Sequence, residues 1–420
     1  MGVPERDRGP RRPLRAAGVG SPAQPTRQRR LPVVLKGMLR AYLDNNASTP
    51  VRPEVVAAML PFLHEGYGNA SSVHQRGQAA RAALEQARAH VAALIAARPA
   101  EIVFTSGGTE ADNLAIWGVL ADLPPGHVIT TAIEHHAVLF PFQELEKRGW
   151  TVTWLPVNAQ GCIDPDDVRR ALTPSTALVS VMMANNETGV IQPVAEVGKI
   201  TRAAGVKLHV DAVQAAGKIP IAVEDLGCEL LSLSGHKLHA PQGVGALYVR
   251  RGTALRPMLY GGRHERERRA GTENIPGIVG LGEASRLATA ERVTSGERLA
   301  ALRDHVESAI LEAVPHAAVV GAGTRTPNTT NICFADVDGE ALVISLDLQG
   351  FCVSAGAACS SGAVDASHVL LAMGLSPARA RSCLRFSLGK QNSTEEVTAL
   401  LEVLPGLVAR LRELSPSWSH

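Results

Sequence analysis

The sequence predicts an α/β protein built on a mainly parallel, doubly wound sheet, and three observations indicate this fold class. Apolar runs of strand length recur along the chain. Stretches with helical spacing of apolar residues separate these runs, which is the pattern of consecutive βαβ units. The chain has 420 residues, 45% of them hydrophobic and 20% charged, which is enough for a full core.

The expected strands follow one another in a regular order. A short strand-like run at residues 39–43 opens the folded part. A glycine-rich turn and a helix beginning near Ala111 follow the first strand of the main sheet. No run of about 18 apolar residues occurs, so we expect no membrane-spanning helix and no membrane partner. The strands of the main sheet are expected at residues 101–105, 127–131, 151–155, 177–183, 207–210, 229–232 and 243–249.

A helical run from about residue 282 to 313 is expected to lead into a second domain. Beyond it lie a strand at residues 383–387 and a final helix that ends near Leu414. We therefore predict a large domain at residues 51–292 and a smaller α+β domain made of residues 39–50 and 293–420.

Residues 1–38 differ in composition from the rest of the chain. They hold eight arginines and one lysine against Glu5 and Asp7, a charge of +7, whereas the whole chain carries +2. Six prolines, five glycines and the lack of apolar periodicity predict a disordered and dispensable basic extension. Met38 lies just before the first expected strand, so an upstream start of translation is an alternative. An organelle transit peptide is another, although the prolines would interrupt its amphipathic helix. No aromatic residues are interleaved with the arginines, so we expect no nucleic-acid partner.

The cysteines give two expectations. None forms a C-x-x-C pair or a His/Cys pattern typical of zinc, so no resident metal is expected. The extension lacks the apolar core of a secretory signal, so we expect a cytoplasmic location, or an organellar matrix if the extension is a transit peptide, and no disulfides. Cys359 differs from the others because it lies among small residues at 354–362, which is typical of an exposed loop carrying a reactive thiol. The six cysteines are Cys162, Cys228, Cys333, Cys352, Cys359 and Cys383.

Lys237 and Asp211 form the most informative pair. Lys237 follows the apolar run at residues 228–233, and Asp211 follows the expected strand at residues 207–210. A pyridoxal phosphate enzyme needs a lysine amine to bond the cofactor and a carboxylate to keep its pyridine nitrogen protonated. Taken alone, either residue would more often be an ordinary surface lysine or strand-end aspartate.

Three other strand ends carry polar groups that suit the same cofactor. The Gly107-Gly108-Thr109 turn precedes a helix, where free backbone N–H groups bind anions such as phosphate. His135 could stack on a flat ring and exchange protons near neutral pH. Asn186 offers an amide to a phenolic oxygen. Because open α/β sheets bind ligands at the carboxyl ends of their strands, these groups are expected to converge.

With these motifs in order, the chain resembles the cysteine desulfurases. These are fold-type I, class-V pyridoxal phosphate enzymes and include the nitrogen-fixation and iron–sulfur-cluster types. The resemblance runs from about Tyr42 to the C-terminus and implies the fold-type I architecture. The matching segments are residues 42–50, 104–110, 134–138, 185–189, 209–214, 234–237, 269–274, the loop around Cys359, and 385–389.

The resemblance implies which residues carry the chemistry. Lys237 would hold the pyridoxal phosphate and move protons, and Asp211 would pair with the pyridine nitrogen. His135 would stack on the ring and assist proton transfer. L-cysteine would be converted to L-alanine, and Cys359 would take the sulfur as a persulfide and pass it to an iron–sulfur scaffold or another acceptor protein. Cys359 would then also be placed to contact a nascent iron–sulfur cluster.

The resemblance also implies which residues bind substrate and phosphate. Arg385, helped by Asn69, would bind the substrate carboxylate, since a guanidinium accepts a carboxylate bidentately. Gln214 and Asn186 would contact the ring oxygen or the substrate. The phosphate-binding residues would be Gly108, Thr109, Ser234, His236 and, from the neighbouring subunit of a homodimer, Thr272.

Two departures and three alternatives accompany this interpretation. Ala70 follows Gly68-Asn69 where the family usually has proline, and Ser360 follows the loop cysteine where threonine is frequent. A selenocysteine lyase would share the fold and cofactor. A class-V aminotransferase would need no loop cysteine, and a non-enzymatic sulfur relay would not need Lys237 with Asp211. The sequence leaves the sulfur acceptor and its pathway open.

Overall fold

The computed structural model describes residues 2, 40–321, 323–355 and 366–415. The chain divides into two compact units, Met1–Met38 and Leu39–His420, and the elements described below belong to the second. The predicted disorder of residues 1–38 therefore falls almost entirely outside the described residues. The loop that carries Cys359 falls outside them as well.

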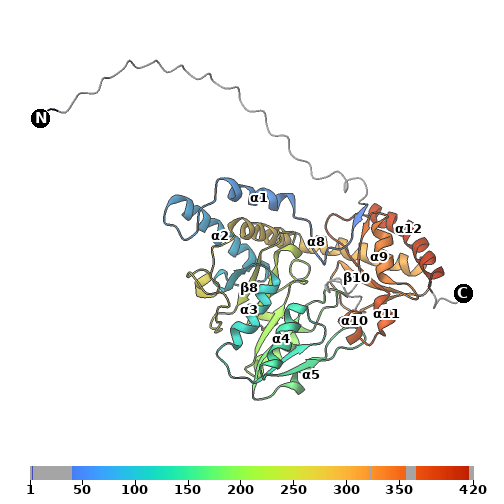
Figure 1. Ribbon diagram of the computed structural model, residues 1–420, viewed down its shortest axis with the longest axis horizontal. Coiled ribbons are helices and arrows are strands. Elements are labelled where there is room, and N and C mark those ends of the chain that lie inside the picture. Colours follow the sequence, from blue (N-terminus) through green and yellow to red (C-terminus); the bar gives the residue numbers. More distant parts are fainter. Residues whose placement is uncertain (1, 3–39, 322, 356–365, 416–420) are drawn as a thin grey trace. The chain divides into compact units, whose positions relative to one another are not determined.

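A seven-stranded sheet forms the centre of the second unit, as predicted (Figure 1). Its strand order is β2-β8-β7-β6-β5-β3-β4. The four pairs from β7 to β4 are parallel, whereas β8 is antiparallel to both of its neighbours. The strands are β2 (Ile102–Thr105), β3 (His127–Thr131), β4 (Thr151–Leu155), β5 (Thr176–Met182), β6 (Lys207–Asp211), β7 (Leu230–Ser234) and β8 (Gly245–Val249).

Helices cover both faces of this sheet, which makes it doubly wound. Residues of α3 and α4 pack with the strands in one apolar cluster. Residues of six other helices pack with the strands in a second cluster on the opposite face. The helices of the first face are α3 (Gly108–Leu120) and α4 (His136–Lys147). Those of the other face are α1 (Pro53–His64), α2 (Gln75–Leu94), α5 (Pro165–Ala171), α6 (Val194–Ala203), α7 (Val223–Leu226) and the first half of α8 (Ile275–Ala313).

Helix α8 connects the two hydrophobic cores. Its first half, from Ile275 to Ala288, packs in the core of the large sheet. Its second half, from Leu299 to Ile310, packs in a separate core with the C-terminal elements. The helix begins earlier than the predicted residue 282, because Asn274 caps it by accepting a hydrogen bond from the Gly277 N–H, and Pro276 lies in its first turn.

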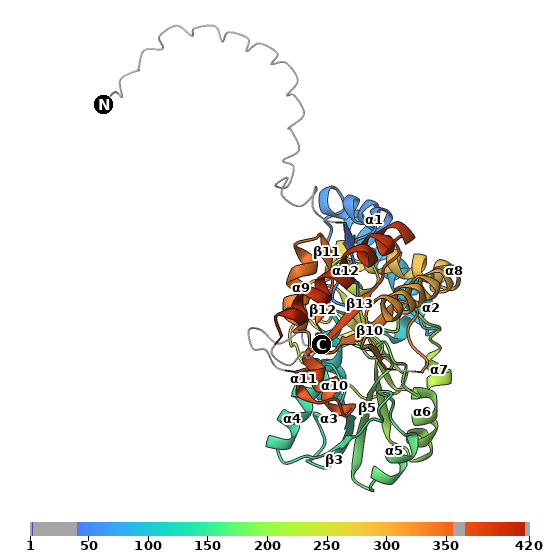
Figure 2. The ribbon, with the colours of Figure 1, turned by 90° about the vertical axis from the view of Figure 1, so that its right-hand side faces the viewer.

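The C-terminal elements form an α+β layer beside the large sheet (Figure 2). A four-stranded sheet has the order β12-β13-β10-β9, and β1 pairs with β11. The domain bounds at residues 51–292 and 293–420 stay a prediction. The strands are β1 (Ala41–Tyr42), β9 (Ala317–Val320), β10 (Thr329–Phe334), β11 (Phe351–Cys352), β12 (Ser354–Ala355) and β13 (Cys383–Ser387). The helices are α9 (Gly339–Asp347), α10 (His368–Ala372), α11 (Pro377–Arg381) and α12 (Thr394–Glu413).

The expectation that the chain has no disulfide is wrong. Cys333 and Cys383 are bonded through their sulfur atoms. The two residues are directly opposite each other in the antiparallel pair of β10 and β13, so the strand register brings them together. Nothing in their spacing of 50 residues signals this contact.

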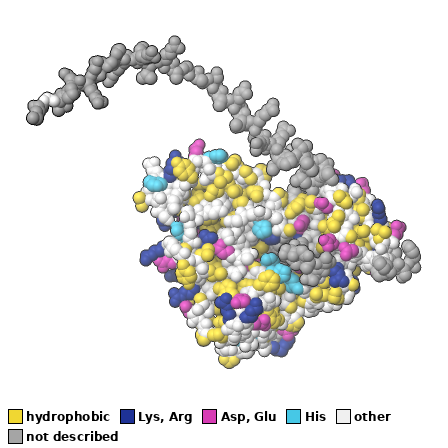
Figure 3. All heavy atoms as spheres, viewed as in Figure 1, with side chains coloured by type: hydrophobic (Ala, Val, Ile, Leu, Met, Phe, Trp, Pro, Cys, Tyr) yellow, Lys and Arg dark blue, Asp and Glu magenta, His cyan; other side chains and the backbone are white. Residues whose placement is uncertain are grey.

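The described surface carries charges of both signs. On the face shown in Figure 3, basic and acidic side chains are interspersed, and histidine side chains gather near the middle. Within the described residues, no helix combines the length and the apolar character needed to cross a membrane.

Candidate active site

The carboxyl ends of five strands meet at one edge of the large sheet. Strands β3, β5, β6 and β7 are mutually parallel, so their carboxyl ends share this edge. Strand β2 has the same direction, because β2 and β7 are both antiparallel to β8. The direction of these strands therefore brings the residues at their carboxyl ends to one edge, as expected.

A cavity of about 320 Å³ lies at this edge. Ten of the predicted site residues line it, together with Asn46, Ala47, Asp112, Met182 and Val213. Those ten are Gly108, Thr109, His135, Asn186, Asp211, Gln214, Ser234, His236, Lys237 and Arg385.

Lys237 reaches the cavity from a short helical turn. Strand β7 is fully buried and continues directly into a 3₁₀ turn at Gly235–Lys237. The Lys237 Nζ donates to the backbone carbonyls of Asn46, at 2.5 Å, and Ala47, at 2.8 Å. The segment that precedes α1 therefore holds the amine at the cavity.

Asp211 ends β6 with a buried carboxylate. Its Oδ1 accepts a hydrogen bond from the Val213 N–H at 2.9 Å. Burial, followed by the nearby Asp112 carboxylate, raises the pKa of Asp211 to about 7. A buried carboxylate with one backbone hydrogen bond is poorly compensated, and a cationic ring nitrogen in the cavity would stabilise its ionised form.

His135 lies at the first turn of α4. Its Nδ1 accepts a hydrogen bond from the Ala137 N–H at 3.1 Å, so the neutral ring carries its proton on Nε2. Burial, and then the charge of Lys237, lowers the pKa of His135 to about 4. The ring is therefore neutral at pH 7, which suits stacking against a flat aromatic cofactor.

The Gly107–Gly108 turn allows a close approach of three backbone segments. A Cβ atom on Gly108 would lie 2.8 Å from a Val213 methyl group and 3.4 Å from the Ser234 Cβ. A Cβ on Gly245 would lie 2.6 Å from the Gly107 carbonyl carbon. Helix α3 begins at Gly108, so its first N–H groups face this edge and suit a phosphate.

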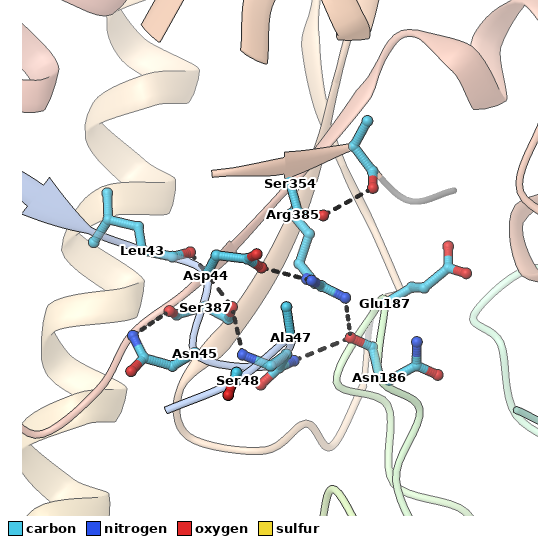
Figure 4. A network of polar contacts seen from close by, with 12 residues as sticks. Leu43, Asp44, Asn45, Ala47, Ser48, Asn186, Glu187, Ser354, Arg385 and Ser387 are labelled. Atoms are coloured by element: carbon cyan, nitrogen blue, oxygen red, sulfur yellow. Dashed lines mark hydrogen bonds and ion pairs between the residues drawn. The ribbon is translucent and has the colours of Figure 1, made fainter. Parts of the chain in front are cut away.

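Arg385 lies in β13 of the four-stranded sheet, and its side chain lines the cavity. Figure 4 shows its polar contacts. Its side chain is buried, and Nη2 donates to the Asp44 carboxylate at 2.7 Å. Nη1 donates to the Asn186 carbonyl at 3.0 Å, whereas the buried Nε has no hydrogen-bond partner in the described part of the chain. The guanidinium is thus held by Asp44 and Asn186 at the cavity that Lys237 also lines.

Two predicted residues, Asn69 and Thr272, are not brought to the cavity of this chain. Asn69 is exposed, and its Oδ1 accepts from the Ser71 N–H in a local turn. Thr272 is exposed as well. Neither lines the cavity. Cys359 lies outside the described residues.

The structure adds functional candidates that sequence reasoning missed. Asn46 was part of a recognised motif, but its contacts with Lys237 and Asn186 could not be foreseen. Asp112 faces the cavity from α3, and burial raises its pKa to about 7. Lys218 reaches Asn46 and Gln214 from behind the cavity. Its position four residues after Gln214 was the only available signal.

Comparisons with known proteins agree with this geometry. The family described as Aminotransferase class-V matches residues 41–400. A protein named cysteine desulfurase from Trichormus azollae is 50% identical over 377 residues, covering 89% of this chain and 94% of its own. A solved NifS-like protein is 36% identical with a TM-score of 0.84, covering 89% of this chain and all of its own. The solved protein SspA in complex with cysteine is 36% identical with a TM-score of 0.74, covering 83% and 98% of the two chains.

Proposed function

Since this chain belongs to the class-V aminotransferase family and, within it, to the cysteine desulfurases, we propose that it binds pyridoxal phosphate and converts L-cysteine to L-alanine. The sulfur passes to the Cys359 thiol as a persulfide and then to an acceptor. The observation that carries this proposal is the convergence of Lys237, Asp211 and His135 on one cavity that Arg385 also lines. The solved relative in complex with cysteine supports the substrate.

The residues of the cavity fit the cofactor. Asp211 offers a buried carboxylate to the ring nitrogen, and His135 offers a neutral ring. The start of α3 offers N–H groups to the phosphate. The amine of Lys237 can bond the aldehyde carbon. When bound, pyridoxal phosphate supplies an electron sink for the charge left on the substrate when its α-carbon loses a proton.

The side chains of the protein then have distinct tasks. Arg385 binds the substrate carboxylate, and Asp44 keeps the guanidinium oriented through the ion pair at 2.7 Å. Lys237 Nζ takes the proton from the substrate α-carbon and later returns a proton to the substrate. Its position beside the Asn46 and Ala47 carbonyls keeps the amine inside the cavity.

Cys359 completes the reaction as a nucleophile. Its thiolate attacks the substrate sulfur, an S–S bond forms and the C–S bond of the substrate breaks. The carbon skeleton keeps the electron pair of that bond, takes up a proton and leaves as alanine. L-cysteine plus an enzyme thiol thus gives L-alanine plus an enzyme persulfide, and no external oxidant is required.

Cofactor binding is the direct test. The reconstituted protein should show the absorption band of a lysine-bound cofactor, and borohydride should fix the cofactor on the peptide that contains Lys237. Lys199, which is exposed on α6, provides the control: Lys199→Met keeps the band, whereas Lys237→Ala loses the borohydride adduct. A protein that stays colourless after reconstitution would overturn the proposal.

We also propose that the protein is a homodimer in which Thr272 completes the phosphate site of the neighbouring subunit. The exposed position of Thr272, away from the cavity of its own chain, supports this. Lys237→Ala and Thr272→Ala should each lose activity as pure proteins. A mixture that exchanges subunits should regain activity, because a mixed dimer contains one intact site. No recovery after proven exchange would contradict the arrangement.

We propose an iron–sulfur scaffold protein, or another thiol-bearing acceptor, as the partner that receives the sulfur. The persulfide must be removed before the next turnover, so acceptor protein should raise the rate of alanine release at limiting reductant. The sulfur on the acceptor can be followed by intact mass.

A further inference from the structure

Lys218 is a partly exposed residue whose amine lies inside the protein, next to the candidate site. The preceding residues 214–216 are buried, and Lys218 lines a cavity of about 60 Å³ that Lys237 also lines. Its Nζ donates to the side-chain oxygens of Gln214, at 2.7 Å, and Asn46, at 3.0 Å. Both acceptors are neutral amides.

In the part of the chain that the structure describes, Lys218 has no negatively charged partner that would account for a lysine at this position. Among the described residues, no carboxylate forms an ion pair with it. Burial, followed by the charges of Lys237 and Arg385, lowers the pKa of Lys218 to about 7. The cavity is also lined by Arg292 and by Arg52 and Lys390, which share the Glu291 carboxylate as their ion-pair partner. A desolvated amine without a carboxylate partner costs stability, so an apolar side chain of equal length would be the more stable choice here.

The hydrogen bonds of Lys218 fix the orientation of the Gln214 amide. Because the Gln214 Oε1 accepts from Lys218, its Nε2 faces the other way and donates to the Asn46 carbonyl at 3.0 Å. That carbonyl also accepts from Lys237. The amine of Lys218 retains two N–H bonds when it is neutral, so it can serve both amide oxygens in either protonation state.

The second contact of Lys218 helps to orient Asn46. The Asn46 Oδ1 accepts from Lys218, so its Nδ2 points toward the Asn186 carbonyl and donates to it at 3.0 Å. The same Asn186 carbonyl accepts from Arg385. The Asn328 Nδ2 also donates to the Asn46 Oδ1, at 3.1 Å, so Lys218 shares the orientation of Asn46 with Asn328. Among the described residues, Lys218 is the donor to the Gln214 Oε1. The two amides in turn contact the groups that hold Lys237 and Arg385.

We propose that Lys218 is a positioning residue: it holds the amides of Gln214 and Asn46 so that the Gln214 Nε2 faces the Lys237 side of the cavity, as a hydrogen-bond donor to the cofactor. This inference rests on the proposed function. Lys218 itself touches neither substrate nor cofactor and acts through Gln214 and Asn46.

The test compares cofactor binding by four variants of the full-length protein. Lys218→Met removes the amine at similar length, and we expect the dissociation constant for pyridoxal phosphate to rise about tenfold. Lys218→Arg keeps donors and has the cavity to expand into, so it should stay within about threefold of the parent. Gln214→Leu should weaken binding as Lys218→Met does. The double variant should be no weaker than the worse single variant, because both changes remove the same interaction.

A spectroscopic readout separates positioning from simple stabilisation. The absorption band of the lysine-bound cofactor changes with pH, and the midpoint of that change is the quantity to measure. In Lys218→Met this midpoint should rise by about one pH unit, because a cation and an oriented donor are lost. Loss of packing alone would lower the melting temperature of the cofactor-free protein and leave this midpoint unchanged. Lys199→Met is the matched control and should change neither quantity. If Lys218→Met is insoluble, Lys218→Gln, which keeps one donor without a charge, should still weaken binding at least threefold.

The outcomes are distinct. A parent protein that does not bind the cofactor overturns the proposed function, and this inference with it. A parent that binds, together with a Lys218→Met variant of equal affinity and equal midpoint, overturns the inference alone. Fully additive effects of the Lys218 and Gln214 changes would also overturn it, because Lys218 would then act by another route.

Discussion

Asp211→Asn is expected to stabilise the cofactor-free protein at alkaline pH while it weakens cofactor binding. The Asp211 carboxylate is buried and accepts one hydrogen bond, from the Val213 N–H at 2.9 Å. The side-chain oxygen of the introduced asparagine could accept the same bond. The substitution therefore removes the charge and keeps the shape of the site.

The size of the effect follows from the pKa of Asp211, which burial raises from 3.8 to about 7. In that pH interval the folded protein retains a proton that the unfolded chain has released, so stability falls as pH rises from about 4 to about 7. A shift of about three units corresponds to about 4 kcal/mol, lost completely above pH 7. Asparagine does not ionise and avoids this loss.

The assay is urea unfolding of the cofactor-free proteins at pH 4.5 and pH 8. The variant should be the more stable by only about 1 kcal/mol at pH 4.5, and by up to about 4 kcal/mol at pH 8. Asp225→Asn, at an exposed position on α7, should change neither value. Cofactor affinity should fall about 100-fold in Asp211→Asn, because a buried charge pair with the ring nitrogen is lost. Equal stability at pH 8 with unchanged affinity would refute the reasoning.

Three further predictions concern other parts of the chain. Cys359→Ala should still bind pyridoxal phosphate but lose persulfide formation and nearly all alanine release. Cys162→Ala, which changes a free cysteine, should stay active. A persulfide that peptide mass spectrometry maps to another residue would exclude Cys359. Deletion of residues 1–37 should leave alanine production and the amount of soluble protein unchanged, which activity and size-exclusion measurements check, and a large loss of either would show that the extension contributes. Arg88→Met should lower the free energy of unfolding by about 3–5 kcal/mol in urea titrations. The buried Glu265 carboxylate would lose the two hydrogen bonds that the Arg88 Nη1 and Nη2 donate to it at 2.7 and 2.8 Å. A loss below about 1 kcal/mol would show that Glu265 finds another partner.

Much of the fold followed from local pattern. Strand β3 was predicted at residues 127–131 and lies at His127–Thr131, and β13 was predicted at 383–387 and lies at Cys383–Ser387. These runs are apolar and short because each strand is buried, so the signal lies in the strand itself. The antiparallel direction of β8 had no such signal, since strand direction depends on the connection and the neighbours.

The candidate site was predictable to the extent that it lies at strand ends. Lys237, Asp211 and Asn186 each follow an apolar run, and parallel strands bring such positions to one edge of the sheet. Arg385 was placed by resemblance, and the structure adds its partner Asp44, which is 341 residues away in the sequence. The role of Cys359 stays a prediction.

The sequence by itself determined the α/β class, the order of the strands along the chain and the set of polar residues at their carboxyl ends, because these depend on neighbouring residues. Only the tertiary structure decided which distant groups meet. The Cys333–Cys383 bond depends on the register of β10 with β13, and the contact of Lys218 with Asn46 depends on how the segment before α1 packs over Gln214. Contacts of this kind leave no periodic trace in the sequence, since each is fixed by the packing of whole elements.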